Sequence, residues 1–255
     1  MELRIYQLDA FASAPFKGNP AAVVPLETWL PDETMQAIAE ENNLAETAFF
    51  VRTGDRYHIR WFTPTVEVDL CGHATLATAA VVGAPRVVFD CRSGEIAVSR
   101  DGNRYTLDFP SIPPVPSEPP PGLIQALGAE PLTILKGHYF LCVYESDETV
   151  RRLTPNMSAL ASVDCSAVIV TVTAPGTDCD FVSRMFAPAK GIPEDPVTGS
   201  AHCTLTPYWS QRLGRKQMFA RQISQRGGEL WCEDRGSRVS ISGHVVKYLE
   251  GAISV

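Results

Sequence analysis

The sequence lacks any block of basic residues and any apolar run long enough to cross a membrane. Its 22 basic and 29 acidic side chains give a formal net charge of −7. An acidic chain without a basic patch has no electrostatic attraction for the phosphates of nucleic acids or for an anionic membrane surface. No apolar run approaches the roughly 18 residues of a membrane-spanning helix. We therefore expect neither nucleic acid nor a membrane as a partner.

Cysteine pairs and cofactor motifs are also absent. The seven cysteines form an odd set without a C-x-x-C pair, and His202-Cys203 has no partners at zinc-site spacing, so neither a disulfide framework nor a metal site is predicted. No glycine-rich dinucleotide motif follows the first strand, and no phosphate-binding loop with its lysine occurs. With no export signal visible, we expect a protein of the reducing cytoplasm that uses no cofactor.

Proline marks the place where the chain divides. Residues 110–121 contain seven prolines, which cannot form a helix interior or a central strand. The sequence predicts a half over residues 1–112 and a second half over 122–255, with the last strand free to return to the first half. Small ligands usually bind in a cleft at such a join, and we expect one here.

The two halves share a pattern that indicates an internal duplication. Arg60-Trp61-Phe62-Thr63-Pro64 and Arg184-Met185-Phe186-Ala187-Pro188 are each followed by an apolar run that begins at a glycine, Gly72 or Gly199. Each arginine segment also follows a strand-turn-strand pattern. The turns of these two patterns fall at Gly54-Asp55 and Pro175-Gly176.

The run from His73 to Val82 is apolar on every side, which is typical of a buried helix. Because its surroundings read as strands, the predicted fold class is α+β: two pseudo-symmetric halves, each a curled mixed sheet around a central helix. Each helix begins at a glycine, and the unpaired N–H groups of a helix start favour an anion. Two helix starts that face one cleft would bind a small carboxylate.

Six motifs occur in a specific order between residue 9 and residue 201: Asp9-Ala10-Phe11, Gly18-Asn19-Pro20, Leu44-Ala45-Glu46-Thr47-Ala48-Phe49, Arg60-Trp61-Phe62-Thr63-Pro64, Cys71-Gly72-His73-Ala74-Thr75 and Glu194-Asp195-Pro196-Val197-Thr198-Gly199-Ser200-Ala201. Together they resemble the PhzF-like isomerase family of phenazine biosynthesis. The resemblance implies the diaminopimelate-epimerase-like fold, no cofactor, and a homodimer. The sequence departs from the family pattern at Ala45, a position at which members of the family often have serine.

The resemblance also implies roles for single residues. Glu46 matches the catalytic acid/base, and His73, Asp195 and Ser200 match the other polar residues of the family's cleft. The backbone at Gly72 and Gly199 matches the sites that receive the substrate carboxylate. The reaction implied is a proton transfer between ring carbons, as in the isomerisation of trans-2,3-dihydro-3-hydroxyanthranilate.

The residues themselves leave alternatives open. Glu46 shares one strand face with apolar neighbours, where it can take and return a proton, or it points into water at the strand edge. His73 lies in the first helical turn, where the dipole disfavours an imidazolium, and it acts on substrate as a neutral group or is satisfied in the core. Asp195 lies in a segment, Gly191–Pro196, that reads as a loop, and it holds an amine, orients His73 or has no role.

Cys71 separates the candidate reactions. The cofactor-free epimerases that share the implied fold use two cysteine thiols, one before each helix-opening glycine. One thiol removes a proton and the other supplies one on the opposite face. Here the second position is Thr198, whose hydroxyl is too weak an acid for that step, so a two-cysteine racemase is disfavoured. We place Thr198 with the substrate-binding residues. An isomerase with Glu46 as its main acid/base is favoured. An amino-acid epimerase using Glu46 and Cys71, and a ligand-binding or interaction protein without catalysis, remain alternatives.

Overall fold

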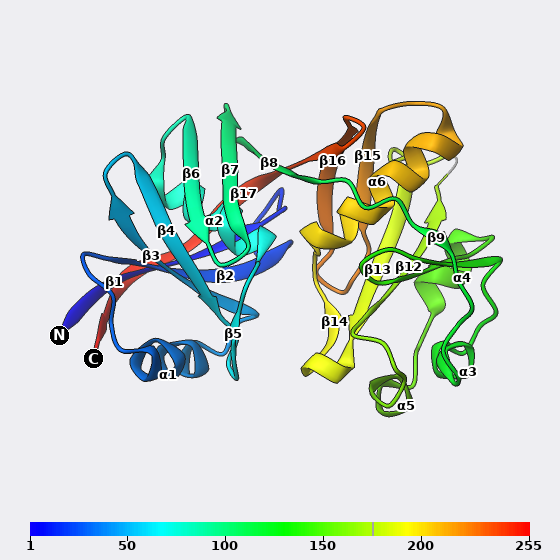
Figure 1. The fold of residues 1–255 in the computed structure, drawn as a ribbon, viewed down its shortest axis with the longest axis horizontal. Helices are drawn as coiled ribbons and strands as arrows, with labels where there is room; N and C mark the ends of the chain where they lie inside the picture. The colour runs from blue at the N-terminus through cyan, green and yellow to red at the C-terminus, as the bar shows by residue number, and fades with distance from the viewer. Residues whose placement is uncertain (175) are drawn as a thin grey trace. The chain divides into compact units, whose positions relative to one another are not determined.

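The computed structural model describes residues 1–174 and 176–255 and divides them into two units (Figure 1). Unit 1 comprises Met1–Phe109 and Ile241–Val255, and unit 2 comprises Pro110–Ser240. The chain therefore enters unit 2 at the start of the proline-rich segment and returns to unit 1 at Ile241. Pro175, half of the turn expected at Pro175-Gly176, lies outside the described residues.

The strands of unit 1 are hydrogen-bonded in a ring. β1 pairs with β2, and the pairing continues through β3, β4, β6, β7 and β8 to β17, which pairs with β1 again. The β2–β3 and β4–β6 pairs are parallel and the short β5 pairs with β4. The elements are β1 (Glu2–Ala10), β2 (Asn19–Leu26), α1 (Asp32–Asn42), β3 (Glu46–Thr53), β4 (Arg56–Phe62), β5 (Glu67–Val68), α2 (Gly72–Val82), β6 (Arg86–Cys91), β7 (Gly94–Asp101), β8 (Arg104–Pro110) and β17 (Arg238–Ser254).

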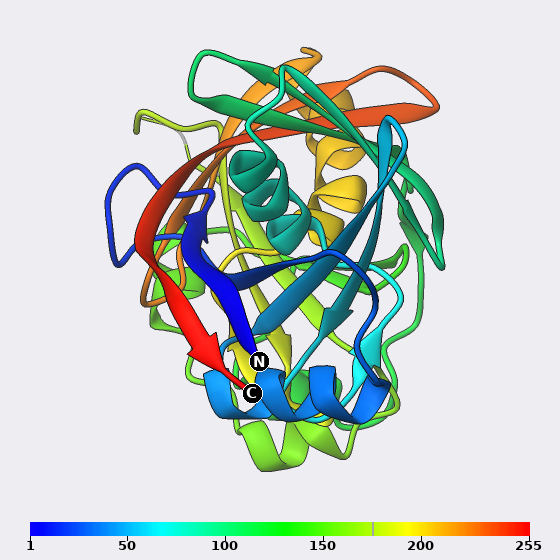
Figure 2. The ribbon, with the colours of Figure 1, turned by 90° about the vertical axis from the view of Figure 1, so that its left-hand side faces the viewer.

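The helix α2 lies within this ring, where Figure 2 shows strands around it. Residues 73–79 are all buried, and the helix packs against β1, β2, β3 and β7. The helix ends at Gly83, whose φ of 75° is in the left-handed region that favours glycine. Because α2 is apolar on every side, a sheet that closes around it buries the whole helix surface. The curled sheet around a central helix is confirmed.

Unit 2 repeats this order of pairings. β11 is parallel to β12, β12 is antiparallel to β13, β13 is parallel to β15 and β15 is antiparallel to β16, as for β2, β3, β4, β6 and β7. The helix α6 follows β14 as α2 follows β5, so the two halves are pseudo-symmetric. The elements are β9 (Val115–Pro116), α3 (Leu123–Leu127), β10 (Thr133–Lys136), β11 (Phe140–Val143), α4 (Asp147–Arg152), α5 (Met157–Ala161), β12 (Val168–Thr173), β13 (Phe181–Ala187), the short 3₁₀ helix η1 (Pro188–Lys190), β14 (Ile192–Asp195), α6 (Gly199–Leu213), β15 (Gln217–Gln222) and β16 (Gly228–Asp234).

One local expectation was wrong, because the segment read as a loop contains the strand β14. Asp195 pairs with Met185 and Ile192 pairs with Ala187, with a shift in register between them. Pro193 lies between the two paired residues. A short, irregular strand of this kind tolerates a proline that cannot donate to the ladder.

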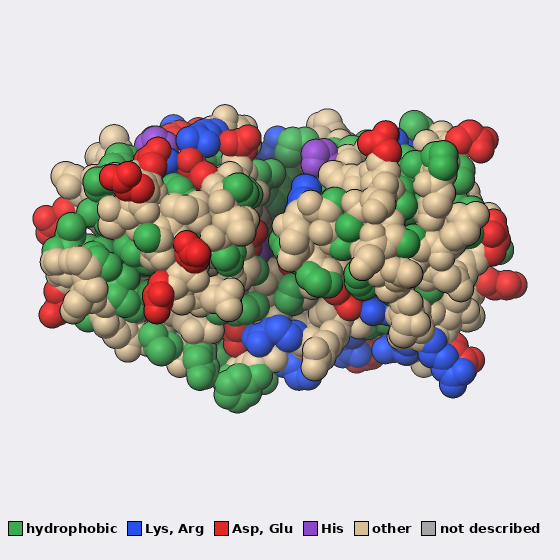
Figure 3. Space-filling model, turned by 90° about the horizontal axis from the view of Figure 1, so that it is seen from below, with side chains coloured by type: hydrophobic (Ala, Val, Ile, Leu, Met, Phe, Trp, Pro, Cys, Tyr) green, Lys and Arg blue, Asp and Glu red, His purple; other side chains and the backbone are tan. Residues whose placement is uncertain are grey.

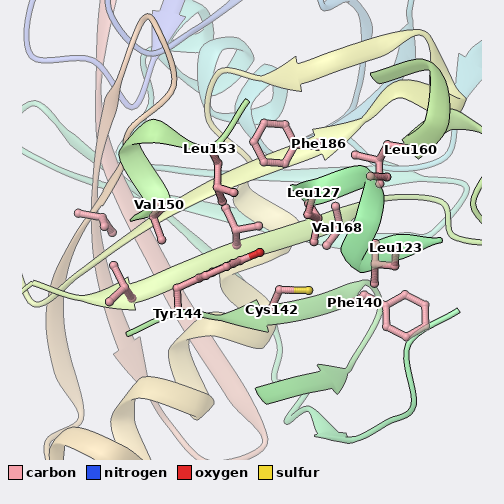
Figure 4. Close-up of a cluster of buried hydrophobic side chains, with 14 of the residues drawn as sticks. Leu123, Leu127, Phe140, Cys142, Tyr144, Val150, Leu153, Leu160, Val168 and Phe186 are labelled. Atoms are coloured by element: carbon pink, nitrogen blue, oxygen red, sulfur yellow. The ribbon is translucent and has the colours of Figure 1, made fainter. Parts of the chain in front are cut away.

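The two faces of β12 pack against different elements. Val168, Val170 and Val172 belong to a buried cluster that also includes residues of α3, α4 and α5 (Figure 4). On the alternate face, the Thr171 hydroxyl accepts a hydrogen bond from the Trp209 indole of α6 (3.0 Å). Since successive strand residues point to opposite faces, the short helices and α6 lie on opposite sides of this part of the sheet.

On the face in Figure 3, hydrophobic side chains are scattered among acidic, basic and uncharged ones. Among the described residues, no helix is both long enough and apolar enough to cross a membrane.

The duplicated arginines form matching ion pairs. Arg60 donates to both oxygens of Glu67 (2.7 and 2.9 Å), and Arg184 donates to both oxygens of Glu194 (2.7 and 2.9 Å). Each guanidinium also lies over the phenylalanine two residues later, 5.2 Å from the Phe62 ring centre and 4.8 Å in unit 2. Each of these two ion pairs, which we call clamps, links the strands that precede a central helix: β4 to β5 in unit 1 and β13 to β14 in unit 2. The shared Arg-x-Phe pattern therefore has a structural role.

Replacing Glu67 by glutamine tests this clamp. The hydrogen bonds from Arg60, more than any other contact, hold the pKa of Glu67 below its ordinary value of 4.5. The carboxylate therefore contributes stability that is present above pH 4.5 and is lost as the pH falls through the lowered pKa. We expect Glu67→Gln to lower the free energy of unfolding by about 1–2 kcal/mol at neutral pH.

Urea unfolding of both proteins between pH 7 and pH 3 measures this effect. The difference between wild type and variant should shrink as the pH falls below 4.5, because Glu67 of the wild type is then protonated and becomes as neutral as the glutamine of the variant. Glu95→Gln is the control, since the Glu95 side chain is 51% exposed in its pair with Arg56 and should change stability little. Equal effects of the two variants at every pH would show that the clamp does not stabilise the fold.

Candidate active site

Three side chains of unit 1 meet at the start of α2. Glu46 is the first residue of β3, Cys71 is the N-cap of α2, and His73 is the second residue of that helix. β3 packs against α2 in the core of the unit, which brings Glu46 to the helix start although 26 residues separate it from His73. The sequence prediction that Glu46 and His73 share a site is consistent with this placement.

The imidazole of His73 lies between a carboxylate and a thiol. Its Nε2 is 3.1 Å from Glu46 Oε2, and its Nδ1 is 3.5 Å from Cys71 Sγ. The side chains of His73 and Glu46 are only 6% and 13% exposed. Beyond this contact with each other, Glu46 Oε2 and His73 Nε2 are buried without a hydrogen-bond partner. Such buried and unsatisfied polar atoms are unusual outside functional sites.

The charges of this cluster differ from the sequence expectation. Burial alone lowers the pKa of His73, but the negative charge that Cys71, when ionised, and Glu46 place beside the ring outweighs burial and raises that pKa well above its ordinary value. Burial, followed by the charge of Glu46, raises the pKa of the Cys71 thiol to about 11. The direction of the His73 shift differs from the expectation of a neutral His73, which considered only the helix dipole and not these neighbours.

The face of β3 that carries Glu46 is apolar, as its alternation predicted. Ala48 is fully buried and Phe50 is 7% exposed, both on the same strand face as Glu46. The backbone at Glu46 pairs with Ala21 of the parallel strand β2. The Glu46 carboxylate therefore lies at the edge of an apolar strand face, with His73 as its polar neighbour.

The predicted residues of unit 2 form a hydrogen-bond network of their own. The Thr198 hydroxyl donates to Asp195 Oδ2, and the Thr198 backbone N–H donates to Gln222 Oε1 (2.9 Å). The amide nitrogen of Gln222 donates to the Asp195 carbonyl (2.8 Å) and to the Thr198 hydroxyl (3.1 Å). Thr198 and Asp195 are thus held in place at the start of α6.

His202 supports the same helix start from inside. Its Nδ1 donates to the Thr198 carbonyl (2.9 Å), and burial lowers its pKa to about 4, so the ring is neutral. Thr75 plays the matching part in unit 1, where its hydroxyl donates to the Cys71 carbonyl. In both units the residue four positions after the N-cap bonds to the N-cap carbonyl.

Neither central helix is capped by the side chain of its N-cap residue. Threonine ordinarily caps a helix by accepting from the first turn, but the Thr198 hydroxyl is directed to Asp195 instead. The backbone N–H groups in the first turns of α2 and α6, which begin at Gly72 and Gly199, are therefore not satisfied by the N-cap side chains. An anion is a suitable partner for such a helix start.

Two further residues escaped the sequence analysis. Gln222 is 1% exposed, and its alternation with the buried Met218 and Ala220 on β15 was a signal that a polar residue points inward. Tyr139 places its hydroxyl 3.3 Å from Ser200 Oγ, a contact across 61 residues that no local pattern indicates. The sequence also predicted no metal site, although Glu46, Cys71 and His73 offer ligand atoms within 4.8 Å of one another.

Replacing Gln222 by leucine tests the network in unit 2. The change keeps the side-chain size but leaves the buried Thr198 N–H without its acceptor, so we expect a loss of about 2–3 kcal/mol in the free energy of unfolding. Hydrogen exchange at the Thr198 amide should also accelerate. Gln217→Leu on the exposed end of the same strand is the control. If both variants unfold at the same urea concentration, Gln222 does not hold this helix start.

The chain resembles proteins of one family over its whole length. The family model described as phenazine biosynthesis-like protein matches residues 8–251. An uncharacterized isomerase of Pseudomonas aeruginosa is 51% identical, with 99% of each chain covered. The crystal structure of a PhzF-family protein of Enterococcus faecalis superposes with a TM-score of 0.96 at 45% identity, covering 100% of both chains. A hydroxyproline epimerase of Agrobacterium vitis shares the fold alone, with a TM-score of 0.58 at 11% identity over 99% of this chain and 92% of its own.

The motifs, the duplicated fold and these matches together show the family. The chain belongs to the phenazine biosynthesis-like, or PhzF-like, family of isomerases.

Proposed function

We propose that this protein moves a proton between carbons of a small cyclic or unsaturated carboxylate, without a cofactor, and that Glu46 is its acid/base. The observation that carries the proposal is the pair of buried atoms, Glu46 Oε2 and His73 Nε2, which lie 3.1 Å apart with no hydrogen-bond partner. A base and a neighbouring donor that are both unsatisfied are ready to act on a bound molecule.

The proposed reaction balances within the substrate and one carboxylate. Glu46 takes a proton from a carbon atom, and the electron pair of that C–H bond moves into the conjugated system. The carboxylic acid so formed returns the proton to another carbon, which restores the Glu46 carboxylate. His73, whose pKa is raised beside that carboxylate, donates to an oxygen of the substrate on which charge develops.

The helix starts support the choice of a carboxylate substrate. The first turn of α2 begins at Gly72, beside Glu46 and His73, and its dipole favours a negative group. The first turn of α6 offers the same chemistry at Gly199 and Ser200, with Thr198 fixing the backbone. We assign Gly72, Thr198, Gly199 and Ser200 to substrate binding and Asp195 to a substrate amine. These assignments are part of the proposal.

An amino-acid epimerase is the second candidate, because Cys71 Sγ lies 3.5 Å from His73 Nδ1 and within 4.8 Å of a Glu46 carboxylate oxygen. A thiol whose pKa is about 11 holds its proton at pH 7, so it suits a donor better than a base. Deuterium incorporation at Cα of a racemised amino acid, lost in Cys71→Ala, would favour this reaction. The isomerase is preferred because Glu46 offers a carboxylate as the base, whereas the Cys71 thiol holds its proton.

Glu46→Gln is the decisive variant for the proposed function. Glutamine preserves the size of the side chain but cannot accept the proton, so we expect turnover to fall by at least about a hundredfold. The measurement is proton NMR in D₂O with a panel of dihydroaromatic acids and amino acids, in which the exchanged C–H signal disappears. Wild type should exchange one class of compound and Glu46→Gln should not.

The control is Glu40→Gln, which alters an exposed glutamate of α1 and should leave exchange unchanged. Far-ultraviolet circular dichroism shows that each variant is folded. Full exchange by Glu46→Gln would refute the assignment of this residue. If wild type binds a compound of the panel by NMR but exchanges no C–H signal on it, the protein is a binding protein toward that class.

A further inference from the structure

The start of α2 gathers three different kinds of metal ligand. Glu46 supplies a carboxylate oxygen, Cys71 a sulfur and His73 a ring nitrogen, and these atoms all lie within 4.8 Å of one another. Cys71 is 6% exposed and His73 is 5% exposed, so the cluster is shielded from water. Two of its atoms, Glu46 Oε2 and His73 Nε2, are buried without a hydrogen-bond partner.

We propose that Glu46, Cys71 and His73 form a binding site for a thiophilic divalent cation, with Zn²⁺ as the preferred ion. Sulfur, imidazole and carboxylate are the three ligand types that zinc sites use, whereas Mg²⁺ and Ca²⁺ require oxygen alone. Three protein ligands would leave the fourth position of the ion open, as in zinc sites that bind water or a small anion.

The three ligand atoms lie within 4.8 Å of one another, a little wider than the spacing in a tetrahedral site. Zinc lies about 2.0–2.3 Å from nitrogen, oxygen and sulfur ligands, which places its ligands roughly 3.3–3.8 Å apart. His73 Nε2 is 3.1 Å from Glu46 Oε2, and His73 Nδ1 is 3.5 Å from Cys71 Sγ. These two contacts use different ring nitrogens, of which only one can bind the ion, so the three side chains must move closer together to complete the set.

The charges of the site also balance. The Cys71 thiol loses its proton to solvent when its sulfur binds the metal, because a coordinated thiol is deprotonated. His73 binds as a neutral imidazole and releases its proton as well if it is charged. One thiolate and one carboxylate then neutralise the two positive charges of the ion. A neutral complex is compatible with a buried position, where an uncompensated charge is costly.

Binding of the ion has a direct consequence for the cluster. The metal would occupy the Glu46 oxygen and one nitrogen of His73, the atoms to which the proposed function assigns proton transfer. Zn²⁺ would therefore act as a reversible inhibitor of that chemistry rather than as its cofactor. The metal site itself stands independently, since its ligands are defined by geometry and not by a substrate.

Co²⁺ is the probe for the test, because cobalt bound to a thiolate gives a near-ultraviolet charge-transfer band that other ligands do not give. The metal-free, reduced full-length protein is titrated with Co²⁺ at neutral pH. We expect a band that saturates at one equivalent and disappears when one equivalent of Zn²⁺ is added. Cys71→Ser should remove the band and weaken Zn²⁺ binding in equilibrium dialysis by at least about tenfold.

Cys91→Ala is the matched control, since Cys91 is a partly exposed thiol at which adventitious metal would bind. It should leave the band and the Zn²⁺ affinity unchanged, and circular dichroism confirms the fold of both variants. Absence of the band in the wild type, or its persistence in Cys71→Ser, overturns the proposal. No substrate is needed, so this result is separate from the exchange experiment on Glu46→Gln.

Discussion

Burial of a helix that is apolar on every side is the constraint on which the architecture depends. A helix with no polar stripe cannot lie on a surface, and in unit 1 the strands close into a ring around α2. The helix N-terminus then lies inside the protein, where its unpaired N–H groups need a partner. Enclosure of α2 therefore produces the helix start at which we propose that a ligand binds.

Short-range patterns predicted much of this structure. The alternation of β3 placed Glu46 on an apolar face, and the glycines at 72, 83, 199 and 214 marked the ends of the central helices. The repeated Arg-x-Phe segments indicated the duplication. These features depend on residues a few positions apart, for which periodicity and glycine conformation are reliable physical guides.

What escaped prediction depends on residues far apart in the chain. The pKa of His73 is raised by Cys71 and by Glu46, which lies 27 residues earlier, and the helix dipole alone does not indicate this direction. Likewise, Gln222 meets Thr198 across 24 residues, and Ile192 forms a strand because β13 lies beside it. Propensity and local electrostatics cannot include such neighbours until the topology is known.

The path of β17 has a consequence for how the protein comes into being. Residues 245–254 pair with β1, yet the ribosome makes them after every residue of unit 2. Unit 1 therefore cannot complete its sheet until unit 2 has been synthesised. Until then, β1 lacks the partner strand β17 on one side. Unit 2 can mature earlier, which reverses the usual order in which an N-terminal domain folds first. During that interval the nascent chain exposes an unpaired strand edge, the kind of surface that chaperones shield.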